Sequence, residues 1–241
     1  FFWDGRSPML RDLTLVPIQD PREMDHSVEG VLAKLNASPT YRDLFWKAFG
    51  VKTITAEELG LAAEQFMLTI MSGSSKFDRF ARGLESLTPE EQQGMQLFNG
   101  EANPNSPTRG ADCFHCHGGN LFTNHKFMNN GLDTVITDPG LGGVTGNPND
   151  MGKFKVPSLR NIAYTPPYMH DGRFQTLMEV VDFYNSGTHA NSPNIDPAMG
   201  DIIRAGGLGL NLQERLALVA FLNALTDTSI ESDTLFQNPF N

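Results

Sequence analysis

Apolar residues recur at helical spacing in several stretches of the chain, and a capping signal stands before most of them. Thr55 lies three residues before Glu58, as in a capping box, and the apolar period then continues to residue 71. Three further cap residues also stand three positions before a glutamate: Thr88, Thr176 and Asn211. Two shorter helices are expected, at 28–36 and 41–49. The pattern therefore predicts a mainly α protein.

The last predicted helix and the middle of the chain differ in character. After Asn211, large apolar residues share one helical face: Leu216, Val219, Leu222 and Leu225. Between 99 and 176 the chain is rich in Gly, Pro and Asn, without a sustained period of 2 or 3.6. Such a long irregular segment is unusual in a compact domain unless a bound group organises it.

That irregular segment contains the only two cysteines, in the sequence Cys113-Phe114-His115-Cys116-His117. C-x-x-C-H is the attachment signature of c-type haem, in which the thiols add to the porphyrin vinyl groups and the histidine binds the iron. A thioredoxin-like redox pair would not account for His117, and a zinc site would need a second pair of ligands. We therefore expect one covalent haem c, around which the loops wrap.

Charge narrows the range of partners. The chain has 18 basic and 28 acidic residues, a formal charge of −10. This disfavours nucleic acid and anionic membranes and favours a basic face on another redox protein. No apolar run approaches the roughly 20 residues of a spanning helix. Because covalent haem attachment takes place outside the cytoplasm, the bacterial periplasm is the expected location.

Six segments carry a family resemblance, in this order: Phe2–Arg6, Pro17–Met24, Ser75–Phe80, Cys113–His117, Phe154–Asn161 and Pro167–Gly172. Together they resemble the signatures of the bacterial di-haem cytochrome c peroxidases, a superfamily that includes MauG. The resemblance implies two cytochrome-c-like helical modules with long irregular loops, each around its own haem. Residues 1–84 would be an incomplete peroxidatic module without its C-x-x-C-H, and 85–241 a complete module. The first haem is then truncated away, carried by another chain, or lost.

Several functional positions of the family have matching residues here. Trp3 resembles the tryptophan that relays electrons between the two haems, and Pro17 resembles the proline of the distal peroxide pocket. Glu23 resembles the distal carboxylate, a general acid and base for the protons of peroxide. Leu13 departs from the family, which usually has a glutamine ten residues after the tryptophan and uses it in handling peroxide.

The second axial ligand of the haem on His117 distinguishes subfamilies. In the helix after Thr176, an apolar stripe puts Tyr184 on the buried face, together with Leu177, Val180 and Val181. The resemblance implies that this position is methionine in the peroxidases and tyrosine in MauG. A phenolate favours Fe(III) and higher states, whereas a thioether raises the potential. Tyr184 is therefore the expected ligand, with Met199 as the alternative.

The resemblance also implies a calcium ion between the haems, bound here by the backbone carbonyls of Thr165 and Pro167. The family ligand that completes this site lies upstream of the present sequence. His170 is expected near the haem edge, where it would support the cofactor rather than bind the iron.

Two function classes follow. The first is an oxidoreductase of the peroxidase and MauG type, which passes electrons between a peroxide-reacting haem and an external donor or protein substrate, with hydrogen peroxide as oxidant. It would act as a homodimer or with a partner chain that carries the other haem. The alternative is a non-enzymatic monohaem electron carrier on the same scaffold. The number of haems in the assembly discriminates between them.

Overall fold

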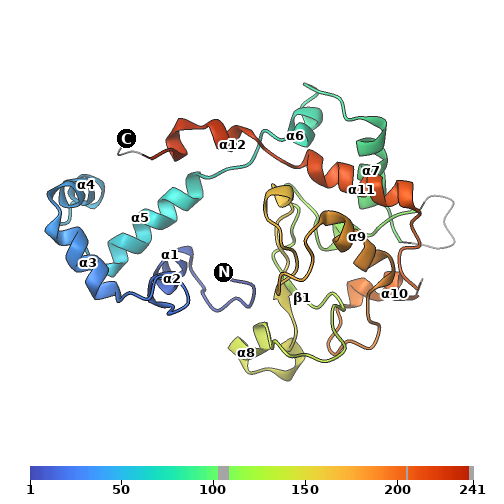
Figure 1. Cartoon of the computed structure of the whole chain (residues 1–241), viewed down its shortest axis with the longest axis horizontal. Helices are drawn as coiled ribbons and strands as arrows, with labels where there is room; N and C mark the ends of the chain where they lie inside the picture. Colours follow the sequence, from blue (N-terminus) through green and yellow to red (C-terminus); the bar gives the residue numbers. More distant parts are fainter. Residues whose placement is uncertain (103–108, 205, 239–241) are drawn as a thin grey trace. The chain divides into compact units, whose positions relative to one another are not determined.

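The computed structural model describes residues 1–102, 109–204 and 206–238 (Figure 1). The chain forms two compact units, 1–71 and 72–241. The sequence suggested a boundary at 84–85, but residues 72–84 group with the second unit, because Phe77 packs into its core and Asp78 pairs with Arg160. None of the described helices is both long and apolar enough to cross a lipid bilayer.

The first unit is helical throughout. Its helices are α1 (Leu10–Leu13), α2 (Leu15–Gln19), α3 (Val28–Ala37), α4 (Pro39–Phe49) and α5 (Ala56–Thr69). Thr55 and Glu58 form the predicted capping box of α5, and α4 ends at Gly50 in the left-handed conformation, with φ 71°. The three helices predicted in this part of the chain are confirmed as α3, α4 and α5, whereas α1 and α2 were not predicted.

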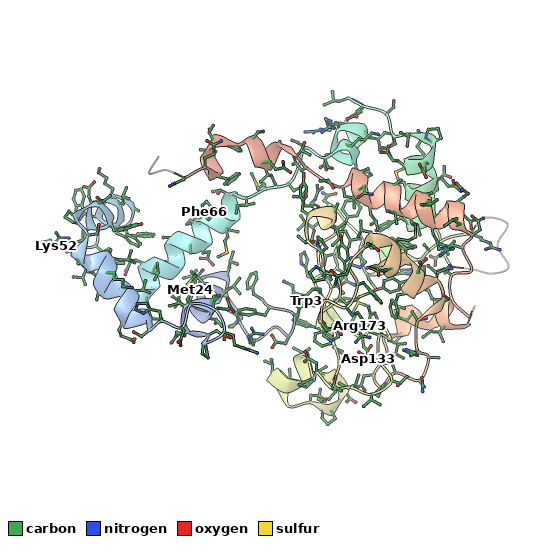
Figure 2. All side chains as sticks on the ribbon, in the orientation of Figure 1. Trp3, Met24, Lys52, Phe66, Asp133 and Arg173 are labelled. Carbon is green, nitrogen blue, oxygen red and sulfur yellow. The ribbon has the colours of Figure 1, made fainter. Side chains whose placement is uncertain are left out.

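Much of the apolar surface of the first unit is exposed. Its large exposed side chains include Met24 and Phe66, both labelled in Figure 2, as well as Trp46, Leu68 and Met71. Phe66 belongs to the predicted apolar stripe of α5, yet it lies in solvent. The buried core of this unit is correspondingly small: Ile18, Val28, Phe45 and Ile54.

The second unit contains the remaining elements. The α-helices are α6 (Lys76–Ala81), α7 (Pro89–Asn99), α8 (Leu141–Thr145), α9 (Leu177–Ser186), α10 (Gly200–Arg204), α11 (Leu212–Ala224) and α12 (Ser229–Ser232). One antiparallel pair joins β1 (Phe127–Met128) to β2 (Phe154–Lys155). The short 3-10 turns are Cys113–His115, Pro148–Asp150, Ile162–Tyr164, Pro197–Met199 and Thr234–Phe236. The starts predicted for α7, α9 and α11 are confirmed by their capping boxes.

Helices α7 and α11 lie side by side and form the centre of the core, with α9 against α11 (Figure 1). A side chain at Gly94 would collide with the backbone carbonyl of Ala217, so glycine permits this close approach. The predicted face of α11 is confirmed in part. Leu222 and Leu225 are buried and Val219 packs against the core, but Leu216 is 36% exposed. The buried face also includes Ala217, Leu218 and Phe221, which the sequence analysis did not place there.

Replacing Gly94 with alanine should destabilise the second unit by about 1–3 kcal/mol, because the methyl group forces α7 and α11 apart. Chemical denaturation followed by circular dichroism would measure the loss. Gly73→Ala is a suitable control, since a methyl group there meets no atom within 4 Å. Equal stability of the two variants would contradict the close crossing.

The beginning and end of the second unit are held together by Asp227, which is 1% exposed. Its carboxylate accepts hydrogen bonds from the backbone N–H groups of Gly73 (2.9 Å) and Ser74 (2.8 Å), and from the hydroxyl of Ser229 (2.6 Å). Its own N–H donates to Asn161 Oδ1 at 2.7 Å. These bonds satisfy a buried carboxylate without a cationic partner among the described residues, and they lower the pKa of Asp227 against the opposing effect of burial.

Candidate haem site

The cysteine motif forms the next described element after α7, the 3-10 turn Cys113–His115, and backbone hydrogen bonds fix this turn. Ala111 N–H donates to Leu97 O at 2.7 Å, Asp112 N–H to Gly100 O at 2.9 Å, and His117 N–H to Cys113 O at 2.8 Å. The motif is therefore anchored to the helix that forms the core. The segment 100–176 otherwise contains only short elements in its described part, as the sequence predicted.

Neither cysteine of the motif forms a disulfide. Burial raises the pKa of Cys113 to about 12, with further contributions from Cys116 and Asp112, and burial raises that of Cys116 to about 11. A nucleophilic redox cysteine or a metal-bound thiolate needs the opposite shift. Among the described residues, neither thiol belongs to a group of three or more metal-ligating side chains. The surroundings thus argue against a redox pair and against a zinc site.

The ring of His117 is fixed by a backbone hydrogen bond. Its Nδ1 donates to the carbonyl of Phe122 at 3.1 Å, so this nitrogen carries a proton. Burial lowers the pKa of His117, although the carbonyls of Phe122 and Pro157 act in the opposite direction. An imidazole oriented in this way, in the same turn as two partly buried thiols, fits covalent haem c.

Tyr184 lies on α9 with its oxygen in a polar contact. Asn130 Nδ2 donates to the Tyr184 hydroxyl oxygen at 3.0 Å. Burial raises the pKa of Tyr184 to about 12, the hydrogen bond from Asn130 lowers it, and charges on Cys116 and Cys113 would raise it further. The phenol is therefore within electrostatic range of both thiols. The second axial ligand stays a prediction.

Met199, the alternative ligand, is 4% exposed and packs in a small cluster with Ala102 and Ile202, against which Tyr184 also packs. Asp196, three residues earlier, contributes to the raised pKa of Cys116, so this loop also faces the thiols. Both candidates thus belong to one region of the second unit.

His170 is fixed by an aromatic contact. Its ring stacks on Phe154, with centroids 3.7 Å apart and planes 10° apart. Both rings line a cavity of about 20 Å³ together with Asn130 and Asp133, and Arg173 pairs with Asp133 beside it (Figure 2). Burial lowers the pKa of His170, although Asp171 opposes this effect. This half-buried, stacked ring agrees with a supporting role.

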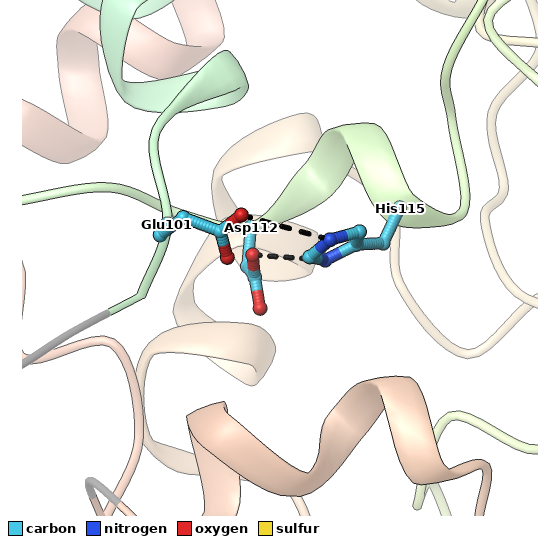
Figure 3. A group of neighbouring side chains, drawn as sticks. All are labelled: Glu101, Asp112 and His115. Carbon is cyan, nitrogen blue, oxygen red and sulfur yellow. Dashed lines mark ion pairs between the residues drawn. The ribbon is translucent and has the colours of Figure 1, made fainter.

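The ring of His115, inside the motif, lies between two carboxylates that the sequence analysis did not single out (Figure 3). Nδ1 is 3.0 Å from Asp112 Oδ1, and Nε2 is 3.8 Å from Glu101 Oε1. The ring of His115 therefore lies between the residue that precedes Cys113 and the segment that follows α7. The i,i+3 spacing of Asp112 and His115 was a usable signal for one of these contacts.

Pro17, Glu23 and Trp3 belong to the first unit. Pro17 lies in α2, and its carbonyl accepts from Met24 N–H at 3.2 Å, so Pro17 and Glu23 share one turn. The side chain of Glu23 is exposed, and Trp3 is 41% exposed. Their proposed roles depend on a haem that the present sequence does not itself attach.

Thr165 and Pro167 lie in an exposed loop after the 3-10 turn Ile162–Tyr164. Among the described residues, neither carbonyl accepts a backbone hydrogen bond outside a helix or strand. Free carbonyl oxygens at the surface suit a hard cation such as calcium.

Comparison with known proteins adds the family. The family model described as di-haem cytochrome c peroxidase matches residues 1–86. MauG of Paracoccus denitrificans is 33% identical over 95% of this chain and 68% of that protein. The cytochrome c551 peroxidase of Nitrosomonas europaea is 34% identical over 75% of this chain and 53% of that protein. The chain spans little more than half of the length of several such relatives.

Solved structures agree. A crystal structure of a MauG-like protein associated with microbial copper homeostasis superposes with a TM-score of 0.81 and 33% identity, covering 99% of this chain and 77% of that one. The di-haem peroxidase BthA of Burkholderia thailandensis has the same fold, with a TM-score of 0.76 at 23% identity. The matched regions include both compact units.

Proposed function

The chain belongs to the family of di-haem cytochrome c peroxidases and MauG, and on that premise we propose that it is an oxidoreductase with one covalent haem c on Cys113, Cys116 and His117. It passes electrons between a peroxide-reacting haem and an external donor or protein substrate. The observation that carries the proposal is His117, whose Nδ1 donates to Phe122 O while two partly buried thiols lie in the same turn.

In this proposal His117 and Tyr184 would both hold the haem iron. The haem, when bound, would supply a one-electron iron couple. Asn130 donates a hydrogen bond to the phenol oxygen of Tyr184 and so stabilises its anionic form. An iron held by both residues would suit electron transfer rather than reaction with peroxide.

Peroxide chemistry then belongs to the first unit, with its haem supplied by an upstream segment or by a partner chain. Glu23 accepts and returns the protons of peroxide, Pro17 lines the pocket, and Trp3 relays electrons toward the second unit. The exposed apolar side chains of the first unit, Phe66 and Met24 among them, support its packing against further residues.

Partners and location complete the proposal. The acidic composition favours a redox partner with a basic face, a small cytochrome or a protein substrate. Assembly as a homodimer or with a haem-bearing partner chain would supply the second haem. We place the protein in the bacterial periplasm, where haem c proteins are matured, and assign a calcium ion to the carbonyls of Thr165 and Pro167.

The test is the mass of the protein purified from a host that matures c-type cytochromes. Under denaturing conditions we expect one retained haem per chain, because one attachment motif is present. The bare polypeptide mass would contradict the assignment of the thiols. The haem count of the native assembly then separates the two function classes. Two haems for each copy of this chain support the enzyme, and one haem supports a monohaem electron carrier.

A further inference from the structure

Two of the segments that carry the family resemblance have no role in the proposed reaction, yet they meet in the structure. Asp78 of Ser75–Phe80 and Arg160 of Phe154–Asn161 form a bidentate ion pair, with nitrogen–oxygen distances of 2.9 and 3.0 Å. Both side chains are 14% exposed. A two-pronged pair with this little solvent contact fixes the guanidinium in position.

The guanidinium and its neighbour Ser158 reach the loop that follows His117. Three successive carbonyls of this loop accept side-chain hydrogen bonds. Arg160 Nε donates to Asn120 O at 2.7 Å, and Ser158 Oγ donates to Leu121 O at 2.6 Å. The third carbonyl, that of Phe122, accepts from His117 Nδ1 at 3.1 Å. Arg160 and Ser158 thus hold Asn120 and Leu121. These two residues immediately precede Phe122, whose carbonyl accepts the hydrogen bond from His117.

Phe122 needs such support. Its φ is 52°, in the left-handed region that a bulky residue adopts at a cost of about 1–2 kcal/mol. Its ring is packed edge-on against Phe77 and Phe98, while its carbonyl points to His117. A cavity of about 360 Å³ borders His117, Phe122 and Arg160. The loop has room to relax on that side, so the hydrogen bonds from Arg160 and Ser158 add to the packing of the Phe122 ring in holding the loop backbone.

We propose that Ser158 and Arg160 are positioning residues, which hold the Phe122 carbonyl against His117 and thereby set the donor strength of His117 toward the haem iron. The carbonyl of Pro157, from the same segment, also acts on the imidazole. The inference rests on the proposed function in one respect, that His117 binds the haem.

The direction of the effect follows from the hydrogen bond. A carbonyl that accepts from Nδ1–H raises the basicity of the other nitrogen, and a more basic ligand stabilises the ferric state. Without Ser158 and Arg160, the Phe122 backbone can relax and this hydrogen bond weakens. The reduced haem is then favoured, and the reduction potential rises.

The experiment compares haem-loaded wild type with the double variant Ser158→Ala/Arg160→Gln by redox titration and by electron paramagnetic resonance of the ferric haem. We expect at least a tenfold higher ratio of reduced to oxidised haem at a fixed potential, a shift of about 59 mV, with altered g values. Ser158→Ala alone should give a smaller shift in the same direction, and Ser158→Thr should restore the wild-type value, because it retains the hydroxyl.

Arg79→Gln is the matched control. Arg79 lies next to Asp78 in helix α6, and the substitution removes its ion pair with Glu85. Neither Arg79 nor Glu85 contacts the 120–122 loop through a described hydrogen bond. An unchanged potential and unchanged g values in the folded double variant would overturn the inference. If that variant fails to fold, Ser158→Ala decides alone, because Ser158 is exposed. A wild-type chain without covalent haem would instead count against the proposed function.

Discussion

Replacement of Tyr184 by phenylalanine should accelerate the reaction of this chain with hydrogen peroxide by about a hundredfold, equivalent to about 2.7 kcal/mol of activation free energy. In the proposed arrangement His117 and Tyr184 would both bind the iron and leave no position for peroxide. The phenyl ring of the variant would keep the aromatic packing beside Met199 while removing the ligand oxygen. The ferric spectrum should change as well, and the potential should rise, because an anionic oxygen donor is lost.

Stopped-flow mixing of the haem-loaded chain with stoichiometric peroxide measures the rate. Tyr168→Phe is the control, since it removes a buried hydroxyl that donates to Ile162 O at 3.1 Å and leaves Tyr184 intact. If Tyr184→Phe changes neither spectrum nor rate, the ligand is Met199 or the site is open. Fast oxidation of the wild-type chain would refute the view that its own haem only transfers electrons.

Removal of the haem should destabilise the second unit by about 4 kcal/mol or more, because a group held by the folded state but not by the unfolded state stabilises the fold. The double variant Cys113→Ala/Cys116→Ala cannot attach the group covalently. In the described part of 100–176 no helix exceeds five residues, so little regular structure holds this segment without its cofactor. We expect loss of its cooperative unfolding transition.

The two units can be observed separately in this experiment. The chain has two tryptophans, Trp3 and Trp46, and both lie in the first unit, so their fluorescence reports that unit. Circular dichroism includes the helices of the second unit. A haem-free variant that keeps a cooperative second-unit transition of wild-type stability would contradict the prediction, whereas an unchanged fluorescence transition is the internal control.

Local signals in the sequence predicted the helices well, because a capping box requires only residues three apart. Thr55, Thr88 and Thr176 each begin a helix with that arrangement. The close crossing of α7 and α11 could not be predicted from local signals, because it depends on Gly94, more than a hundred residues before α11. The boundary between the two units could not be predicted for the same reason, because it depends on the pairing of Asp78 with the distant Arg160.

The candidate site shows the same division. Cys113, Cys116 and His117 are contiguous and carry their chemistry in their spacing, so the attachment motif could be found from the sequence alone. Tyr184 was selected by its position in an apolar stripe and by family resemblance. Asn130, which donates to it, comes from a loop 54 residues away, and no local pattern indicates that contact. Hydrogen bonds between distant loops are the part that sequence periodicity does not encode.

The carboxylate of Asp227 has a consequence for the order of folding. Its bond to Ser74 joins residues 153 positions apart, and closing a loop of that length carries a length-dependent entropy cost of about 4 kcal/mol. During synthesis or export, this closure has to wait until residue 227 has emerged. Cys113 and Cys116 emerge more than a hundred residues earlier. The two thiols therefore emerge on an open chain, before the hydrogen bonds that join the beginning and end of the second unit can form.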